Sequence, residues 1–428
     1  MHRRFRLALA IVALPALASC ATTPPAPMTQ HQQEPAAPPA DPAPEHVLAL
    51  SAEEAALTPE QVLGKRLFED ENLSEPHGQS CKSCHDPLKA FTGDAGSTVA
   101  GVAAGAVPGV VGNRNVPTAM YLATSPSFSF VGEPNDTGGI DYTPTGGFFW
   151  DGRAASLSEQ AKGPFLNPRE MNNPSQAAVI TKVRNATYAS LFRRVYGDRA
   201  LDDVGKAYDK LAQAIAAFEG SPLFSPFSSK FDDYLRGKAS LTAQEAKGFA
   251  LFKNPDKGNC MGCHAGDPKS RKPQDWLFTD FTYDNLGVPR NQAIPDNQDP
   301  AHFDPGLAGQ AGLAAKLPAG VDPARLVGAF KVPTLRNIQK TGPYMHNGKF
   351  AQLRDVVKFY VTRDTNAGLW YPKDATGKVI KFNDLPTAAK ANVNTEEVPY
   401  DRKAGEKPRL NDDEIDAVVA FLNTLTDR

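Results

Sequence analysis

The sequence predicts a mainly α-helical protein of two tandem domains. Three observations support this prediction: a helix-forming segment that occurs twice, a short cysteine–histidine motif that follows each copy, and an amphipathic helix near the end of each half. A repeat of this kind indicates two related domains rather than one. The chain has 428 residues, which is enough for two or three domains that each bury a core.

The composition limits the classes of function. Lys and Arg together number 46, and Asp and Glu number 48, so the formal net charge is −2. This balance excludes a nucleic-acid binder that works through bulk positive charge. The 34 Gly and 37 Pro indicate long loops between the helices, with only short strands.

The first residues have the pattern of an export signal. A basic start precedes an apolar run from Leu7 to Ala18, which is too short to span a membrane, and Leu17 to Cys20 resembles the bacterial lipobox. We therefore expect residues 1–20 to be a lipoprotein signal peptide and Cys20 to carry the lipid. An ordinary secretory peptide with a leftover thiol is the alternative.

A linker follows the expected signal peptide. Residues 21–47 are rich in Pro and Ala and lack apolar periodicity, which is typical of an extended segment. Ala21 directly after the cysteine is the pattern associated with outer-membrane sorting. The expected location is therefore the periplasm, with a lipid anchor to the outer membrane.

The repeated segment predicts a helix in each half. Residues 57–68 align with residues 241–252, and Leu, Thr, Gly, Leu and Phe recur at one constant offset. In each copy a Thr is followed three residues later by Gln or Glu, which is the capping box of a helix start. Pro59 occupies the favoured first helical position.

Each copy leads into a Cys-x-x-Cys-His motif. The residues are Cys81, Cys84 and His85 in the first half, and Cys260, Cys263 and His264 in the second. Two cysteines three apart can form thioethers with both vinyl groups of one haem, and the adjacent histidine is then held beneath the iron. A zinc site would require further Cys or His ligands, and a disulfide would not require the histidine twice. The sequence therefore predicts two covalent c-type haems in two cytochrome c-type domains.

Each half also closes with an amphipathic helix. The apolar stripes consist of Leu211, Ile215 and Phe218 in the first half, and of Ile415, Val418, Val419 and Leu422 in the second. We expect the two domains to span residues 48–223 and residues 224–428.

Besides the two haem motifs, six further blocks of sequence are distinctive: Asn113 to Thr118, Phe149 to Arg153, Gln160 to Pro164, Pro168 to Met171, Val332 to Asn337 and Pro343 to Gly348. Together with the haem motifs, these blocks resemble the bacterial dihaem cytochrome c peroxidases, including their MauG-type branch, over nearly the whole mature chain. The resemblance implies that the first haem is the peroxide site and that the second haem transfers electrons.

The resemblance assigns roles around the first haem. His85 resembles its proximal ligand, and Glu170 resembles the distal acid–base, with Gln160 and Pro164 lining the same pocket. A carboxyl group of tuned pKa suits peroxide cleavage, because one proton must move between the two oxygens. From its own surroundings alone, a solvated residue in a turn rich in Asn and Pro is the better interpretation of Glu170, and only the match of the block favours the catalytic role. No histidine occurs between His85 and His264, so we expect the first iron to lack a distal histidine, as in the MauG-type branch.

The second haem should take His264 on one side. A Met on the other side would raise the potential, and a Tyr phenolate would lower it. The peroxidase branch has a Met at the position that Tyr360 occupies here, fourteen residues after His346, so Tyr360 resembles the MauG-type ligand. Tyr360 also shares a helical face with Leu353, Val356 and Val357, and a core aromatic residue is therefore the alternative.

Other roles also rest on the resemblance. Trp150 resembles the indole between the haems that relays electrons. Asn115, with main-chain oxygens of Thr341 and Pro343, resembles a Ca²⁺ site, which favours oxygen ligands. We expect His346 to be structural or near the haem propionates, and residues 136–147 to form a flap over the first haem.

The resemblance implies an enzyme that reduces hydrogen peroxide to water with electrons from a small cytochrome c or cupredoxin. A MauG-type enzyme that oxidises residues of a partner protein is the main rival, although residues 256–259 lack the Trp that precedes its second haem motif. A dihaem electron-transfer cytochrome and a dioxygen-cleaving enzyme are also compatible with the two haem motifs.

Overall fold

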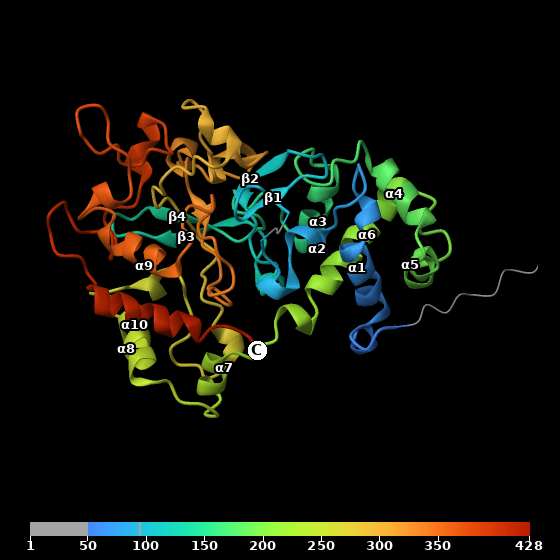
Figure 1. Ribbon diagram of the computed structural model, residues 1–428, viewed down its shortest axis with the longest axis horizontal. Helices are drawn as coiled ribbons and strands as arrows, with labels where there is room; N and C mark the ends of the chain where they lie inside the picture. The colour runs from blue at the N-terminus through green and yellow to red at the C-terminus, as the bar shows by residue number, and fades with distance from the viewer. Residues whose placement is uncertain (1–49, 94–95) are drawn as a thin grey trace, which may run out of the picture. The chain divides into compact units, whose positions relative to one another are not determined.

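Two pairs of packed helices form the framework of the protein (Figure 1). The computed structural model describes residues 50–93 and 96–428. Helix α1 (Pro59–Glu69) packs on α6 (Val204–Glu219), and α8 (Ala243–Lys253) packs on α10 (Asp412–Asn423). The expected signal peptide 1–20, with Cys20, and the linker 21–47 lie outside the described residues.

The repeated capping boxes begin the first helix of each pair. Thr58 Oγ1 accepts a hydrogen bond from Gln61 N, and Gln61 Oε1 accepts one from Thr58 N. Thr242 and Glu245 exchange the same two bonds at the start of α8. The two helix starts predicted from the repeat are therefore confirmed.

A repeated glycine lets each pair of helices pack closely. A Cβ atom at Gly64 would overlap the carbonyl oxygen of Ala214, and one at Gly248 would overlap that of Ala417. At both points one helix backbone lies directly against the other, which leaves no room for a side chain. The glycine that recurs in the repeat thus marks the contact between the first and last helix of each half.

Aromatic rings fill the space beside each of these contacts. The ring centroids of Phe68 and Phe218 lie 5.5 Å apart, and those of Phe252 and Phe421 lie 5.2 Å apart. The apolar stripes predicted on α6 and α10 are buried, apart from the partly buried Val419. Both predicted closing helices are therefore confirmed, and apolar burial holds each pair together.

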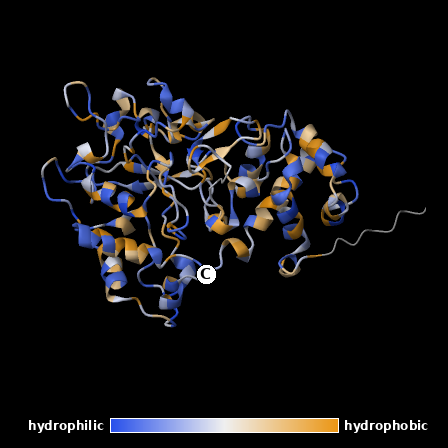
Figure 2. Cartoon of the chain, in the orientation of Figure 1, coloured by the Kyte–Doolittle hydropathy of each residue, from blue (hydrophilic) through white to orange (hydrophobic). Residues whose placement is uncertain are grey.

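The remaining regular elements are short, as the mainly α prediction requires. The other helices are α2 (Cys81–Cys84), α3 (Leu157–Leu166), α4 (Gln176–Asn185), α5 (Ala189–Tyr196), α7 (Lys230–Leu235) and α9 (Leu353–Thr362). In the part of the chain that the structure describes, the strands form three two-stranded antiparallel sheets: β1 (Val102–Ala104) with β2 (Val111–Asn115), β3 (Ser129–Pro134) with β4 (Ile140–Thr145), and β5 (Tyr283–Asp284) with β6 (Phe330–Lys331). Helices such as α6 carry both hydrophobic and hydrophilic residues along their length (Figure 2).

Strands β3 and β4 form a hairpin that contains most of the 136–147 insertion. Thr145 pairs with Thr282, and the Tyr283 hydroxyl donates a hydrogen bond to Gly146 O at 2.6 Å. Phe130 packs on a small apolar cluster that consists of Leu307, Leu313 and Ala329. The expectation of a flap over the first haem is wrong, because strand pairing and aromatic packing hold the hairpin on the second half.

Residues 50–428 form one compact unit. Contacts that are distant in sequence join its two halves; for example, the Tyr121 hydroxyl donates to the Asp427 carboxylate at 2.6 Å. The expected domain boundary between residues 223 and 224 falls in the short helix Pro222–Phe224 and stays a prediction. Within residues 50–93 and 96–428, no helix has the length and apolarity needed to cross a membrane.

Candidate functional site

The first Cys-x-x-Cys-His motif forms the single helical turn α2 and the residue that follows it. His85 N donates a hydrogen bond to Cys81 O, which closes the turn. His85 Nδ1 lies 2.9 Å from Phe91 O. A carbonyl oxygen only accepts, so Nδ1 carries the proton and Nε2 keeps the lone pair that a metal needs. Burial lowers the pKa of His85, which favours this neutral ring.

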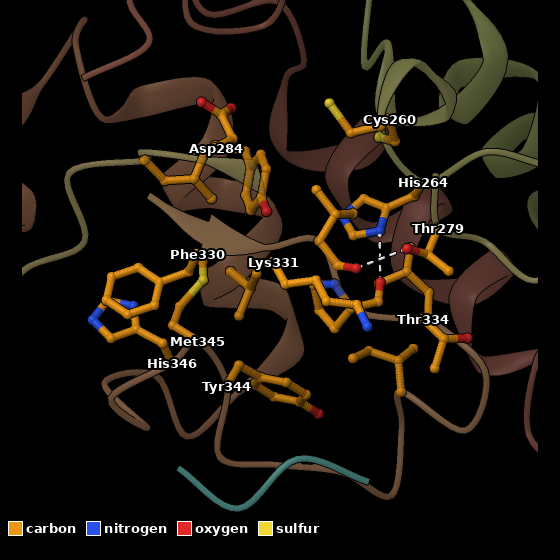
Figure 3. Close-up of a pocket in the computed structure, with 18 of the residues that line it drawn as sticks. Cys260, His264, Thr279, Asp284, Phe330, Lys331, Thr334, Tyr344, Met345 and His346 are labelled. Atoms are coloured by element: carbon orange, nitrogen blue, oxygen red, sulfur yellow. Dashed lines mark hydrogen bonds between the residues drawn. The ribbon is translucent and has the colours of Figure 1, made fainter. Parts of the chain in front are cut away.

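The second motif presents its histidine in the same way. His264 Nδ1 lies 3.2 Å from both Phe278 O and Pro333 O, and its Nε2 is therefore also the metal-binding nitrogen. Figure 3 shows His264 beside Thr279, whose hydroxyl donates to Val332 O at 2.7 Å. Burial lowers the pKa of His264 as well. Both motif histidines are thus oriented as ligands by main-chain carbonyl groups.

No disulfide joins the four motif cysteines. Burial raises the pKa of the Cys260 and Cys263 thiols to about 12, and it also raises the pKa of the Cys81 thiol. Zinc binds thiolates, and the described residues contain no group of three His, Cys, Asp or Glu side chains that could hold a metal. Paired cysteines without further metal-ligating side chains nearby fit thioether formation with haem and do not fit a zinc site.

A large cavity opens in front of His264 (Figure 3). Its volume is about 650 Å³, which lies within the range of cofactor sites. The two motif cysteines and His264 line it, and so does the predicted helix face with Leu353, Val356, Val357 and Tyr360. An apolar cavity with an inward-facing imidazole nitrogen and two thiols has the residues that a covalent haem requires. The residues present therefore fit the group.

Two further residues of this wall, Tyr360 and Met345, carry an atom that could bind iron in addition to His264. Burial raises the pKa of the Tyr360 phenol, the neighbouring Cys263 and Asp284 raise it further, and a hydrogen bond from Tyr400 lowers it. Met345 also lines the cavity, where Figure 3 shows it beside Phe330 and His346. The helical face predicted for Tyr360 is correct, and its role as a ligand stays a prediction.

Trp150 also lies in the cavity wall. Its indole Nε1 donates a hydrogen bond to Asn115 O at 2.8 Å, and its carbonyl accepts one from Lys331 N at 2.9 Å. Phe149 and Gly152 on either side have positive φ angles of 64° and 67°, so the block folds into a tight loop. This loop fixes the indole ring, because both its main chain and its ring nitrogen are bonded.

A network of alternating charges follows Trp150. Asp151 accepts hydrogen bonds from Arg114 at 2.7 Å and from Arg153 at 2.9 Å, and Arg114 also binds Asp304 at 2.6 Å. Arg114 lies over the ring of Phe330, which is itself stacked on His346 with 3.6 Å between ring centroids. Burial lowers the pKa of His346 to about 4, so the ring is neutral near pH 7. A packing role for His346, as expected, is consistent with this stack.

Glu170 follows α3, the helix that carries Gln160 and Pro164. Gln160 and Pro164 are four residues apart and share one face of the helix. Burial raises the pKa of Glu170, whereas the charge of Arg153 and a hydrogen bond with Asn167 lower it. Glu170 is also close enough to Cys81 to raise the pKa of that thiol. The structure thus brings Glu170 to the first motif, together with Arg153.

Glu219 is a second carboxyl group beside Cys81 that the sequence did not reveal. It is 6% exposed, and one of its oxygens accepts no hydrogen bond from the described residues. Burial raises the pKa of Glu219 from its ordinary value of 4.5 to about 8. A carboxyl group at the end of an amphipathic helix carries no sequence signal that distinguishes it from an exposed one.

Glu219 should make the stability of the protein depend on pH. Between about pH 4.5 and pH 8 the folded state holds a proton that the unfolded state has lost, so the free energy of unfolding falls as pH rises. We expect Glu219→Gln to remove this loss of stability. The loss amounts to roughly 1.4 kcal/mol for each unit by which folding raises the pKa of Glu219. Denaturant unfolding at pH 5 and pH 8 checks this, with the exposed Glu159→Gln as control. An equal effect of Glu219→Gln at both pH values would contradict the assignment.

Asn115 is enclosed by the loop at residues 343–346. Its side-chain Nδ2 donates to Pro343 O at 2.7 Å and to Met345 O at 3.0 Å, and its main-chain N donates to His346 O. The structure therefore brings Asn115 to Pro343, as expected, but the amide nitrogen faces the carbonyl oxygens. Thr341 lines the same cavity as Asn115 and Pro343.

Lys331 is another residue of the cavity wall that sequence reasoning missed (Figure 3). Its Nζ donates to Ser125 Oγ at 2.9 Å and to Gly147 O. Burial lowers the pKa of Lys331 to about 8. The one sequence feature that could have identified Lys331 is its position directly before the block Val332 to Asn337.

Comparisons with known proteins show which proteins this chain resembles. A family model described as di-haem cytochrome c peroxidase matches residues 59–240. The chain is 37% identical to the methylamine utilization protein MauG of Paracoccus denitrificans (strain Pd 1222) over 379 residues, 86% of this chain and 88% of the relative. It is 31% identical to the cytochrome c551 peroxidase of Nitrosomonas europaea over 336 residues, 76% and 80% of the two chains. The crystal structure of the diheme peroxidase BthA from Burkholderia thailandensis E264 is similar, with a TM-score of 0.78, 40% identity and 86% of each chain covered.

Proposed function

Because the chain belongs to the di-haem cytochrome c peroxidase family, we propose that it reduces hydrogen peroxide to water with electrons from a small cytochrome c or cupredoxin. The family implies two c-type haems. The observation that carries the proposal is the position of Glu170, a carboxyl group of raised pKa near the first motif and Arg153. The overall step consumes one peroxide, two electrons and two protons, and it yields two waters.

Haem at the first motif would supply the iron redox chemistry that breaks the oxygen–oxygen bond. The proposed role of Glu170 is to accept a proton from one peroxide oxygen and return it to the other. A raised pKa suits both steps, because the carboxylate then binds a proton firmly enough to take it and still releases it. The positive charge of Arg153 opposes this rise in the pKa of Glu170, and the proposed role of Gln160 and Pro164 is to line the same pocket.

Trp150 is the proposed relay between the two haems. Its indole is held at the cavity wall by Asn115 O, and an aromatic ring there shortens the path for electrons. We expect Trp150→Phe to slow donor-supported turnover while the first reaction with peroxide persists. Loss of the indole bond should also lower the free energy of unfolding by about 1–3 kcal/mol.

Trp276→Phe provides the matched control for Trp150→Phe. Trp276 is a buried indole whose Nε1 donates to Ser270 O at 3.0 Å, and it lies outside the cavity lining. We expect Trp276→Phe to lose as much stability as Trp150→Phe but to keep the native rate of turnover. Equal turnover in the two variants would contradict the relay role of Trp150.

We propose that Tyr360 would hold the iron of the second haem together with His264. Two observations support this ligation: Tyr360 lines the cavity, and it lies near the motif cysteines Cys260 and Cys263. A phenolate ligand stabilises oxidised iron and lowers its potential. The solved structures that resemble this chain include a BthA variant in which one tyrosine is replaced by methionine.

A direct test mixes haem-loaded protein with hydrogen peroxide and a reduced cytochrome c or cupredoxin. The proposal predicts oxidation of the donor that depends on peroxide and exceeds the rate with Glu170→Gln. Donor oxidation that stays at the level of this variant would overturn the proposal.

A MauG-type enzyme that oxidises residues of a partner protein is the second candidate. The 37% identity to a MauG protein and the position of Tyr360 favour it. The absence of Trp from residues 256–259 disfavours it. Covalent modification of a partner protein after addition of peroxide, without turnover of a small donor, would select this candidate.

Calcium and the membrane anchor are further parts of the proposal. We expect one Ca²⁺ to bind the side-chain oxygen of Asn115 and main-chain oxygens of Thr341 and Pro343. A half-turn of the Asn115 amide would direct its oxygen to the ion. Metal analysis of the purified protein tests this, and a calcium-free active protein would contradict it.

Lipidation at Cys20 and a periplasmic location predict release of the protein from membranes by Cys20→Ala, and retention would contradict them.

A further inference from the structure

Tyr121 places a buried phenol in the wall of the cavity in front of His264. Its side chain is 2% exposed, and its hydroxyl donates a hydrogen bond to Asp427 Oδ2 at 2.6 Å. The main chain is fixed as well, because Tyr121 N donates to Phe224 O at 2.9 Å. A haem in this cavity would therefore border a phenol that is already bonded to a carboxyl group.

The surroundings of Asp427 fit an ionised carboxylate. Its Oδ2 accepts a second hydrogen bond from Asn337 Nδ2 at 2.8 Å. Its Oδ1 accepts bonds from Ser228 N at 2.9 Å and from Ser228 Oγ at 3.2 Å. An ionised carboxyl group is an acceptor only, and both oxygens of Asp427 act as acceptors. Asp427 is therefore a base that can take the phenolic proton.

The charges around Tyr121 favour loss of that proton when the ring is oxidised. Burial raises the pKa of Tyr121, the charge of Arg336 opposes this, and Asp427 raises it further, so the resting phenol is neutral. The guanidinium carbon of Arg336 lies 5.1 Å from the ring centroid, and Arg336 also binds Asp232 at 2.9 Å. A positive ring next to this guanidinium would be repelled. An oxidised Tyr121 is therefore more stable as a neutral radical, with its proton on Asp427.

Other tyrosines have one of these two features without the other. Tyr283 lines the same cavity, but its hydroxyl donates to Gly146 O at 2.6 Å, and a main-chain carbonyl is too weak a base to keep the proton. Tyr188 donates to the Asp70 carboxylate but lies outside the cavity lining. Within residues 50–93 and 96–428, Tyr121 alone combines a place in the cavity wall with a hydrogen bond to a carboxylate.

We propose that Tyr121 is a redox-active residue that stores one oxidising equivalent of hydrogen peroxide when no reduced donor is present. This inference rests on the proposed reaction of the haem-loaded protein with peroxide. One electron passes from the phenol to the second haem after peroxide has oxidised the protein. The phenolic O–H bond breaks, and the proton forms a new O–H bond with Asp427. The products are a neutral tyrosyl radical and a protonated carboxyl group.

Electron paramagnetic resonance of haem-loaded protein, frozen after addition of one equivalent of hydrogen peroxide without a donor, tests this proposal. We expect an organic radical signal that becomes narrower when the tyrosines carry ring deuterium and that is lost in Tyr121→Phe. Asp427→Asn should lose it too, because an amide can accept the hydrogen bond but cannot keep the proton. A radical signal that persists in either variant would overturn the inference.

Two substitutions are matched controls. Tyr283→Phe removes a hydroxyl from the same cavity wall, and Tyr188→Phe removes one that is bonded to a carboxylate. Both variants should keep the native radical signal, and its loss in either of them would overturn the assignment to Tyr121. If Tyr121→Phe fails to fold, fluorinated tyrosine at position 121 keeps the shape of the ring. Its fluorine nucleus should split the signal, and an unsplit signal would overturn the inference.

The haem signals in the same spectra separate this inference from the proposed function. Haem signals that respond to peroxide without any tyrosyl radical overturn the inference alone. Haem signals that peroxide leaves unchanged overturn the proposed peroxidase together with the inference.

Discussion

Glu170→Gln is expected to lower kcat/KM for hydrogen peroxide by roughly 10²–10⁴-fold. Gln has the shape of Glu and can form similar hydrogen bonds, but it neither takes up nor returns a proton. Burial raises the pKa of Glu170, and the charge of Arg153 opposes this effect. Steady-state oxidation of a reduced donor, measured against peroxide concentration, gives the expected loss.

Glu159→Gln is the matched control for this substitution. Glu159 is an exposed residue in the first turn of α3, where its carboxylate accepts a hydrogen bond from Ala155 N. The control should keep native kinetics, because this carboxylate lies at the helix start and serves the helix cap. A Glu170→Gln protein that is fully loaded with haem and retains native kcat/KM would exclude Glu170 as the acid–base.

Gly64→Ala and Gly248→Ala are expected to have the largest effects on stability. In each case the new methyl group would overlap a main-chain carbonyl oxygen of the partner helix. A backbone oxygen cannot rotate away as a side chain can, so the two helices must separate. Overpacking of this kind costs about 1–3 kcal/mol and sometimes more, and the separation would also loosen the neighbouring aromatic contacts. Urea unfolding followed by circular dichroism measures the loss.

Gly205→Ala tests whether the effect is specific to the helix contacts. Gly205 lies in α6, and a Cβ there would meet only the Asp203 side chain at 3.6 Å. Alanine favours helix over glycine by up to about 1 kcal/mol, so this variant should equal or exceed native stability. If Gly64→Ala and Gly248→Ala proved as stable as Gly205→Ala, the close packing of the two pairs would be contradicted.

Local sequence signals predicted the framework correctly. The capping boxes at Thr58 and Thr242 depend on residues three apart, and the stripe on α9 that ends at Tyr360 depends on helical spacing. The two haem motifs are equally local. In each case the interacting residues lie within one helical turn or one helix. The local sequence alone therefore contains the information needed to predict them.

Contacts between distant segments could not be predicted in this way. Arg114 binds Asp304, which is 190 residues further along the chain, and Tyr400 reaches Tyr360 from a loop without apolar periodicity. The predicted place of the β3–β4 hairpin was wrong for the same reason, because its position depends on pairing with Thr282. Only the folded chain shows which charges and hydroxyl groups meet.

Electron paramagnetic resonance of the isolated, oxidised, haem-loaded protein tests the central claim most directly. An open first site and a second site with two protein ligands predict one high-spin and one low-spin ferric signal. The high-spin signal should disappear when one equivalent of hydrogen peroxide is added. Two low-spin signals that peroxide leaves unchanged would contradict the proposed peroxidase and identify an electron-transfer cytochrome.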